Sequence, residues 1–330
     1  MTLKVALIYN DPQPDRYGAM GESKAELGVL DEVKAVSKAL DELHYECTLM
    51  PLRPPLTKVK RAIQLIKADV VFNLFEGFDG SPESEGRIAE MLAELKLPFT
   101  GCPAAALDLA LDKAKTKKLL SEAGISTPRY QIMTPGELKN FNLNFPCLVK
   151  PVNEDASHGL SEDSVVHNLT ALKKQVEKIC SGFGGQALVE EFLNGREFNT
   201  VVMGNERLTL PAVSEIVFTL PPDKPRILTF ASKWDESSLY YINTKAHCPA
   251  QITAREQARI TKLAKSAFRI TGCRGYARVD FREGQPGRFY VLEVNPNPDI
   301  TPGSGAALQA ATAGLTYSRF IDRILHLALQ

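Results

Sequence analysis

The stretch of sequence that says most about the fold consists of two short runs, Gly275-Tyr276-Ala277-Arg278-Val279-Asp280-Phe281 and Phe289-Tyr290-Val291-Leu292-Glu293-Val294-Asn295-Pro296. Polar and apolar residues alternate in both runs, and Pro286-Gly287 lies between them, which is the pattern of a β-hairpin. If the turn centres on that dipeptide, Asp280 lies opposite Glu293 and Arg278 lies opposite Asn295. Side chains alternate between the two faces of a strand, so the other face is expected to pack in the core. The residues expected on that core face are Val279, Phe281, Leu292 and Val294.

Two carboxylates on opposed strand positions repel each other, which costs stability unless a cation lies between them. Asp280, Glu293 and the side-chain carbonyl of Asn295 offer hard oxygen ligands suited to magnesium, which typically also keeps water and binds substrate phosphates. Arg278 beside them fits a site that handles a phosphate or a developing oxyanion. The alternative is that these carboxylates belong to a solvated acidic face.

The composition narrows the classes of partner and metal. The chain has 330 residues, enough for two or three packed subdomains, and 39 Lys plus Arg balance 39 Asp plus Glu. No net charge attracts it to nucleic acid or to an anionic membrane, so neither partner is expected. The N-terminus lacks the pattern of a secretory signal, and the six scattered cysteines contain no C-x-x-C pair, so reduced thiols and a cytoplasmic location are expected. The five dispersed histidines leave magnesium-type oxygen ligation as the metal chemistry to pursue.

The first third of the chain alternates strand and helix patterns. Residues 5–9 and 70–74 are buried-strand runs, residues 98–100 form a further short strand, and apolar residues at helical spacing lie between them. The apolar positions of the first helix are Leu27, Leu30, Val33, Val36, Leu40 and Leu43. This order predicts a parallel sheet covered on both faces, with ligands bound at the carboxyl ends of its strands.

The rest of the chain divides into two further units. A lysine-rich helix begins near Asp112, and strands at 147–150 and 187–190 flank a helix that carries Leu172, Val176 and Ile179. The last unit has mostly strand character, with one long helix around residues 260–268. The predicted domains are therefore 1–110, 111–192 and 193–330.

No glycine-rich nucleotide-binding motif of the common kinds is present. Lys150 ends a buried strand just before a polar loop that reaches Gly159, and such a loop can fold its amides over phosphates while the lysine adds a point charge. Taken alone, Lys150 also fits an ordinary surface lysine, and residues 190–197 also fit a charged hairpin.

Together these segments resemble the ATP-grasp superfamily, and within it the D-alanine–D-alanine ligase family. The resemblance is clearest from about Asp112 to the C-terminus. It is carried by residues 112–117, 148–151, 189–197, 275–280 and 292–295. It implies an α/β protein with α+β character in its C-terminal part, namely an ATP-grasp fold preceded by a doubly wound parallel-sheet domain. It also implies a homodimer and small amino-acid or peptide substrates.

The resemblance implies roles for individual residues. Lys113 and Lys150 would contact ATP phosphates, Glu190, Glu191 and Leu193 would meet adenine, and Glu197 would meet the ribose. Asp280, Glu293 and Asn295 would bind two magnesium ions, for which manganese could substitute. Arg278 would stabilise the acyl phosphate and the oxyanion, Lys233 would be the lysine of a lid formed by residues 226–241, and Ser304 would hold the carboxylate of the acceptor. Capping of the following helix is the alternative for Ser304.

The sequence departs from true D-alanyl ligases only around the amino-acid substrates. The early G-G-x-S-x-E motif of the family is missing at residues 10–14. Ala156 stands where the family has a serine in the phosphate-side loop, and Trp234 stands where it has a tyrosine in the lid. Asp299 replaces a glycine whose amide would face the tetrahedral intermediate. Its backbone N–H survives, and its side chain either orients the incoming amine or forms a structural turn.

The leading hypothesis is an ATP-dependent carboxylate–amine ligase that forms an amide through an acyl phosphate, with amino acids or a dipeptide as substrates. The second is an authentic D-alanine–D-alanine ligase. The third, a catalytically silent nucleotide-binding protein, is disfavoured because the predicted metal ligands are intact. The sequence leaves open the two substrates, their chirality and the oligomeric state.

Overall fold

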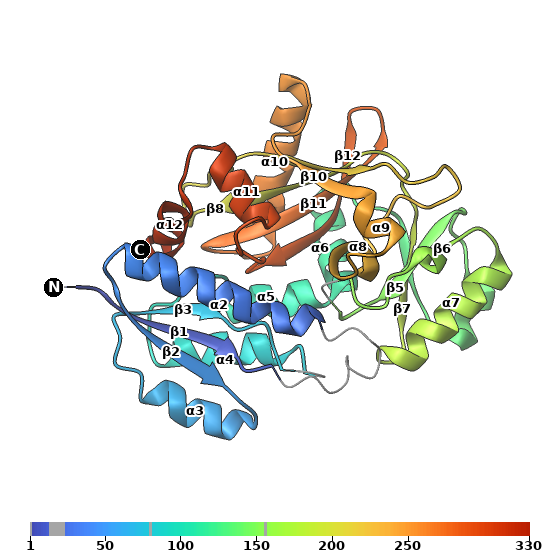
Figure 1. Ribbon diagram of the computed structural model, residues 1–330. Coiled ribbons are helices and arrows are strands. Elements are labelled where there is room, and N and C mark those ends of the chain that lie inside the picture. Colours follow the sequence, from blue (N-terminus) through green and yellow to red (C-terminus); the bar gives the residue numbers. More distant parts are fainter. Residues whose placement is uncertain (1, 13–23, 79–80, 155–156) are drawn as a thin grey trace.

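The computed structural model describes residues 2–12, 24–78, 81–154 and 157–330. These residues form three sheets with helices packed around them (Figure 1). Among them, no helix is both long enough and apolar enough to cross a bilayer.

The first sheet is parallel and covered on both faces, as predicted. It contains β2 (Glu46–Leu52), β1 (Lys4–Asn10) and β3 (Val70–Leu74) in that order. One face packs against α2 (Lys24–Glu42) and α12 (Tyr317–Ala328), and the other against α3 (Leu56–Gln64) and α4 (Ser84–Glu94). Because α12 is the last helix of the chain, the C-terminus returns to the first sheet (Figure 1).

Two details of this sheet, and one of the helix packed on it, differ from the sequence prediction. The sequence pattern gave no sign of β2, because it is an edge strand in which only Leu52 is buried. The strand expected at 98–100 is reduced to one β-bridge between Phe99 and Val71. Helix α2 forms as predicted, but Leu27 and Leu30 are 45% and 43% exposed, and its buried face is formed by Val29, Val33, Val36 and Leu40.

The central sheet is antiparallel, with strand order β4 (Tyr130–Met133), β7 (Ala187–Glu191), β5 (Cys147–Pro151) and β6 (Val165–Val166). Helix α7 (Leu169–Gly182) packs on it through the three predicted residues, Leu172, Val176 and Ile179. Short 3-10 helices lie at Pro135–Asn140 and Glu162–Ser164. Helix α5 (Ala104–Leu111) leads into the predicted lysine-rich helix, α6 (Lys113–Glu122), which Asp112 caps by accepting the N–H of Lys115 at 2.9 Å.

The third sheet has the strand order β10 (Thr244–His247), β9 (Ser214–Phe218), β8 (Glu197–Met203), β11 (Tyr276–Gln285) and β12 (Arg288–Pro296). The predicted long helix is α10 (Ala254–Ile270), whose buried Ile260, Ala267 and Phe268 pack against the sheet. Helix α11 (Gly305–Thr312) contacts β8, and α8 (Phe230–Trp234) and α9 (Leu239–Ile242) lie between β9 and β10 in the sequence. Mixed helices and sheets, with the parallel sheet at the N-terminus, confirm the predicted fold class.

The hairpin of β11 and β12 forms in the predicted register. Asp280 pairs with Glu293 and Arg278 pairs with Asn295. The prediction for Leu292 is wrong, because the register shifts after Asp280 and places Val291, fully buried, opposite Phe281. A second shift between Glu283 and Gln285 restores the register at the turn. Each strand has one extra residue, so the two register shifts cancel. A simple count from the turn therefore gave the right pairs at the site.

Candidate active site

Four polar side chains lie together on the hairpin face that does not pack in the core. Arg278 donates two hydrogen bonds to Asp280, from Nε to Oδ1 at 2.7 Å and from Nη2 to Oδ2 at 2.8 Å. The amide nitrogen of Asn295 lies 3.0 Å from Asp280 Oδ2 and 3.3 Å from Glu293 Oε1. The structure therefore brings all four predicted residues into one cluster.

The charges around this cluster are predominantly positive. Burial raises the pKa of Glu293, but the charges of Lys150, Lys113, Arg278 and Lys233 outweigh it and lower that pKa to about 2. Burial raises the pKa of Asp280, and Arg278 only partly offsets this. Glu293 is therefore the carboxylate that stays ionised most firmly, held by cations from separate elements.

A buried ion cluster lies beside the hairpin, and the sequence reasoning found only part of it. Glu190 Oε2 lies 2.8 Å from Lys117 Nζ, and Glu190 Oε1 lies 3.0 Å from Lys150 Nζ. The side chains of Lys117, Lys150 and Glu190 are 1%, 8% and 2% exposed, so Lys150 is not the surface lysine of the alternative interpretation. Lys117 also donates to Thr127 Oγ1 at 2.9 Å. Two cations and one anion leave one net positive charge at this place.

The other predicted nucleotide residues lie around this cluster in different orientations. Lys113 is buried and donates to the backbone carbonyl of Glu154, in the polar loop after β5. The Glu191 carboxylate instead accepts from Arg129 and Asn144 at the surface, at 3.1 Å each. Neighbouring residues of a strand face opposite sides, so the side chain of Glu191 does not join that of Glu190.

Arg282, which the sequence analysis did not select, ties three segments together. Its guanidinium donates to the carbonyl of Leu193 at 2.8 Å, forms an ion pair with Glu197, and donates to the carbonyl of Arg226. It is 3% exposed and is therefore a buried anchor for the 193–197 turn and the start of the 226–241 segment. Alternation along β11 places Arg282 on the same face as Arg278 and Asp280, and that signal would have found it.

The predicted lid segment packs over the loop after β5. Phe230 donates its N–H to Leu160 at 3.1 Å, and its ring lies 5.5 Å from that of His158 and 6.3 Å from that of Trp234. Burial lowers the pKa of Lys233, and Arg278 lowers it further. Lys233 therefore lies within electrostatic reach of the hairpin. Closing and opening of the segment stays a prediction.

The residues after β12 connect the site to the first unit. Asn297 accepts the N–H of Cys102 at 2.8 Å, close to Gly101, which has a φ of +94°. A Cβ on Gly101 would lie 2.2 Å from Asn297 Oδ1, so both the φ and the close approach require glycine. Asp299 accepts the N–H of Thr301 at 2.7 Å, which is the structural turn proposed as one of its roles.

Ser304 is the N-cap of α11, where its Oγ accepts the N–H of Ala307 at 3.4 Å. The alternative of helix capping is therefore confirmed. The hydroxyl can still donate its hydrogen, so a role toward a substrate carboxylate stays a prediction.

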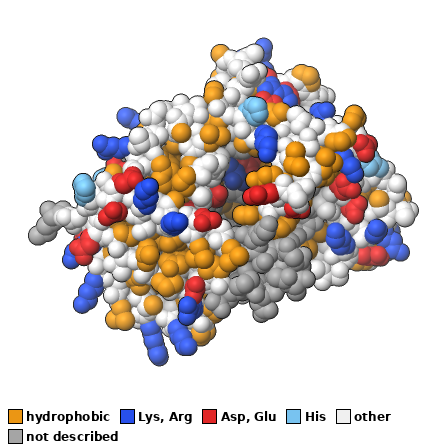
Figure 2. All heavy atoms as spheres, viewed as in Figure 1, with side chains coloured by type: hydrophobic (Ala, Val, Ile, Leu, Met, Phe, Trp, Pro, Cys, Tyr) orange, Lys and Arg blue, Asp and Glu red, His pale blue; other side chains and the backbone are white. Residues whose placement is uncertain are grey.

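Acidic groups gather on the side of the site next to the first sheet. Glu32 is 4% exposed and accepts the N–H of Ile300, the residue after Asp299, at 2.8 Å. Desolvation, together with the charge of Asp299, raises the pKa of Glu76 to about 7. The molecule is hollowed near the centre of the face shown in Figure 2, where basic and acidic side chains both gather. Ala156 and residues 13–14, where the sequence departs from D-alanyl ligases, lie outside the described residues.

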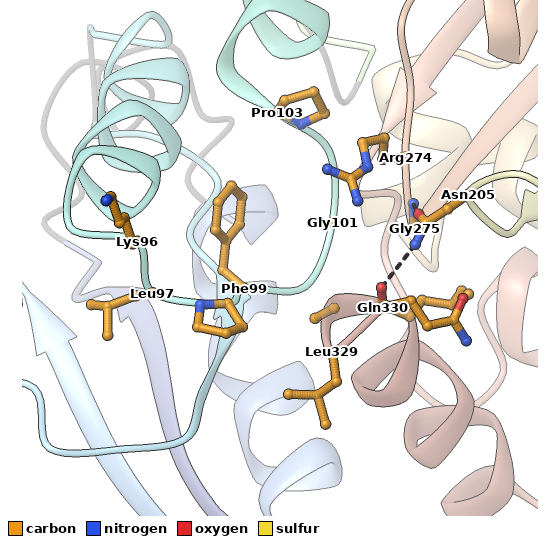
Figure 3. A pocket seen from close by; sticks show the side chains of 13 residues that line it. Lys96, Leu97, Phe99, Gly101, Pro103, Asn205, Arg274, Gly275, Leu329 and Gln330 are labelled. Atoms are coloured by element: carbon orange, nitrogen blue, oxygen red, sulfur yellow. Dashed lines mark hydrogen bonds between the residues drawn. The ribbon is translucent and has the colours of Figure 1, made fainter.

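A separate pocket lies between the end of α12 and residues 96–103. Lys96, Phe99, Arg274 and Leu329 line it, and Asn205 donates to the carbonyl of Leu327 at 2.9 Å (Figure 3). None of the predicted catalytic, nucleotide or metal residues lines this pocket.

Comparison with known proteins identifies the family. The family model described as D-ala D-ala ligase C-terminus matches residues 119–326. An uncharacterised protein of Sinorhizobium fredii is 35% identical over 260 residues, which is 78% of this chain and 74% of that protein. The D-alanine–D-alanine ligase of Glaesserella parasuis is 31% identical over 306 residues, 91% of this chain and 92% of the relative.

A solved structure agrees with these matches in its fold. The Bacillus anthracis D-alanine–D-alanine ligase complexed with ATP has a TM-score of 0.76 and 20% identity, and the match covers 100% of this chain and 97% of that one. The family model alone spans well over half of the chain, and the curated relative spans nearly all of it. The chain therefore belongs to the D-alanine–D-alanine ligase family of ATP-grasp enzymes, ADP-forming ligases that join a carboxylate to an amine.

Proposed function

We propose that this chain uses ATP and magnesium to phosphorylate the carboxylate of an amino acid or short peptide, and then joins that acyl group to an amine. The observation that carries the proposal is the hairpin cluster, in which Asp280 and Glu293 oppose each other beside Arg278. The carboxylates are suited to magnesium and the guanidinium to an acyl phosphate, and the two groups are adjacent.

The donor set fits magnesium better than a transition metal. Among the described residues, no group of three His, Cys, Asp or Glu side chains could hold a metal by itself. Asp280, Glu293 and an Asn295 amide rotated by 180° would supply oxygens only, with water and phosphate oxygens completing the shell. Magnesium bound there would neutralise charge on the phosphates. The four cations around Glu293 lower its pKa and keep its carboxylate ionised for this role.

The phosphates are proposed to lie between the hairpin and the two predicted lysines. Lys150 and Lys113 both act on the charge of Glu293, which supports their place on the phosphate side of the site. The Glu190 carboxylate is engaged by Lys117 and Lys150, so it is proposed to hold these lysines in position. Contacts of the 190–193 segment with adenine would then be made by its backbone. Glu197, fixed by Arg282, is proposed to face the ribose.

After phosphoryl transfer, the amine attacks the carbonyl carbon and inorganic phosphate leaves. Arg278 and Lys233 are proposed to stabilise negative charge on the acyl phosphate and on the tetrahedral oxyanion. The Asp299 carboxylate accepts the N–H of Thr301, and the backbone N–H of Asp299 is the proposed hydrogen-bond donor to the oxyanion. Excluding water matters because an acyl phosphate hydrolyses readily, and the 226–241 segment is placed to do this.

The substrate pair is proposed to differ from two D-alanines. Trp234 replaces a hydroxyl group of the family's D-alanine site with a larger apolar surface, and loss of a hydrogen-bond partner costs about 1–3 kcal/mol. Glu32, Glu76 and Asp299 make this side acidic, which favours a substrate that presents an ammonium group there. The relative in Glaesserella parasuis keeps authentic D-alanine–D-alanine ligation as the second candidate.

A product screen tests this assignment. The purified chain would be incubated with ATP, magnesium and pairs of L- and D-amino acids and dipeptides, and ADP and new amides would be measured by mass spectrometry. We expect ADP formation to depend on a substrate other than D-alanine alone, and a Glu293→Gln variant to be slower by on the order of a hundredfold. Efficient formation of D-alanyl-D-alanine would favour the second candidate. If ADP formation did not depend on any amino acid or dipeptide, and no new amide appeared with any pair, ligation would be refuted.

A further inference from the structure

Helix α2 contains a glycine at a place where another unit of the molecule approaches it closely. Gly28 lies inside α2, and glycine is less favourable than alanine within a helix. A Cβ added to Gly28 would lie 3.3 Å from Cη2 and 3.6 Å from Cζ3 of Trp234. The indole ring thus packs directly on the helix backbone, and a longer side chain at this position would meet the ring.

Trp234 belongs to a row of rings that spans the lid segment. The Phe230 ring lies between those of Trp234 and His158, at 6.3 and 5.5 Å. Helix α8 is therefore held at one end by the loop after β5 and at the other by α2 of the first unit. Figure 1 shows the beginning of α2 beside α8.

The same face of α2 also contacts the segment that follows the hairpin with the predicted metal ligands. Glu32 lies four residues after Gly28, so the two share one side of the helix. The Glu32 carboxylate accepts the N–H of Ile300, just beyond β12, at 2.8 Å. One side of α2 thus holds Ile300, four residues beyond the end of β12, and one helical turn earlier it contacts Trp234, which follows Lys233.

We propose that Gly28 is a positioning residue: because it has no side chain, Trp234 can seat on α2, and this contact fixes Lys233 over the Arg278–Asp280 pair. The proposal rests on the proposed function, since it assigns to this contact the closure of the lid over nucleotide. In the closed state of the lid, α2 of the first unit would then be in contact with Trp234.

The packing of Trp234 on Gly28, called the seat below, is tested with Gly28→Leu, which adds a helix-favouring side chain at the contact. Trp234 is the only tryptophan in the chain, so its fluorescence reports on this site alone. With magnesium and ATP as the probe, acrylamide quenching of wild-type fluorescence should decrease, whereas in Gly28→Leu it should stay at the nucleotide-free value. The dissociation constant for ATP should rise on the order of tenfold, because the closed state is populated less. Lys34→Leu, on the exposed side of α2, is the matched control and should behave as wild type.

Two further variants separate the seat from a general effect on folding. Gly28→Ala, which requires the ring to move by only a few tenths of an ångström, should have an intermediate effect. Adding Trp234→Ala to Gly28→Leu should remove the clash and return ATP affinity to that of Trp234→Ala alone. Gly28→Leu that is folded, binds ATP as wild type and shows the same quenching would overturn the seat while leaving the proposed function standing. A wild-type chain that does not bind ATP would instead overturn the proposed function and the seat with it.

Discussion

The buried trio of Lys117, Lys150 and Glu190 allows a sharp prediction about stability. Glu190 is in direct contact with both ammonium groups, which are 1% and 8% exposed, and replacing it with Gln removes that contacting charge. Removing one partner of a buried ion pair typically costs about 3–5 kcal/mol, because the other charge is left unpaired. With almost no exposure there is little solvent screening to reduce this value. We therefore expect Glu190→Gln to lower the free energy of unfolding by about 3–5 kcal/mol.

The matched control is Lys117→Met, which removes one of the two cations at similar side-chain length. Glu190 then still pairs with Lys150, while the contacts of Lys117 with Glu190 and with Thr127 are lost. Because no buried charge is left without a partner, the cost should be smaller, about 1–3 kcal/mol. Both variants would be measured by urea unfolding at pH 7. A loss below about 1 kcal/mol in Glu190→Gln, or equal losses in the two variants, would refute the idea that Glu190 compensates both lysines.

The pH dependence gives an independent check on Glu190. Burial raises its pKa, but Lys117 and Lys150 outweigh burial and hold that pKa below its usual 4.5. A carboxyl whose folded pKa is depressed contributes stability above its unfolded pKa and loses it as the pH falls toward the folded value. Wild type should therefore lose stability below about pH 4.5 through this group, and the Gln variant should lack that part of the slope.

Three further outcomes are expected. Because burial, with the charge of Asp299, raises the pKa of Glu76 from 4.5 to about 7, wild type should lose stability as the pH rises between these two values. Glu76→Gln should flatten this slope in thermal unfolding scans, and an unchanged slope would contradict the raised pKa of Glu76. Arg282→Lys should weaken ATP binding in calorimetric titration, because lysine cannot bridge Leu193 and the other two partners at once, and unaltered affinity would remove Arg282 from the nucleotide side. Ser304→Ala should cost about 0.5–2 kcal/mol as a lost helix cap and raise the KM for the acceptor amino acid more than that for the donor; equal changes in both KM values would leave Ser304 with capping alone.

Local patterns predicted the hairpin well, for a physical reason. Alternation fixes which residues share a face, and the turn fixes the register, so Asp280 and Glu293 were placed opposite each other from sequence alone. The error at Leu292 arose because two register shifts cancel, which a count from the turn cannot detect. The helices with strong apolar spacing were predicted for the same local reason, whereas the exposed edge strand β2 gave no signal.

Features that depend on distant contacts could not be read from the sequence. Lys117 lies one turn after Lys113 in a run of lysines, and nothing local distinguishes the side chain that is buried against Glu190 from its exposed neighbours. The contact between Gly28 and Trp234 joins residues far apart in the chain, as does the bond from Ile300 to Glu32. Such pairs become visible only when the units are packed together.

Transfer of an oxygen isotope from the substrate carboxylate tests the central claim most directly. A carboxylate labelled with ¹⁸O would be supplied with ATP, magnesium and an amine, and the inorganic phosphate would be analysed by mass spectrometry. Phosphorylation of the carboxylate predicts one labelled oxygen in each phosphate released, in a one-to-one ratio with ADP and amide, and loss of this signal in Glu293→Gln. Phosphate without label, or AMP and pyrophosphate in place of ADP and phosphate, would contradict an acyl phosphate formed at the Asp280–Glu293 site.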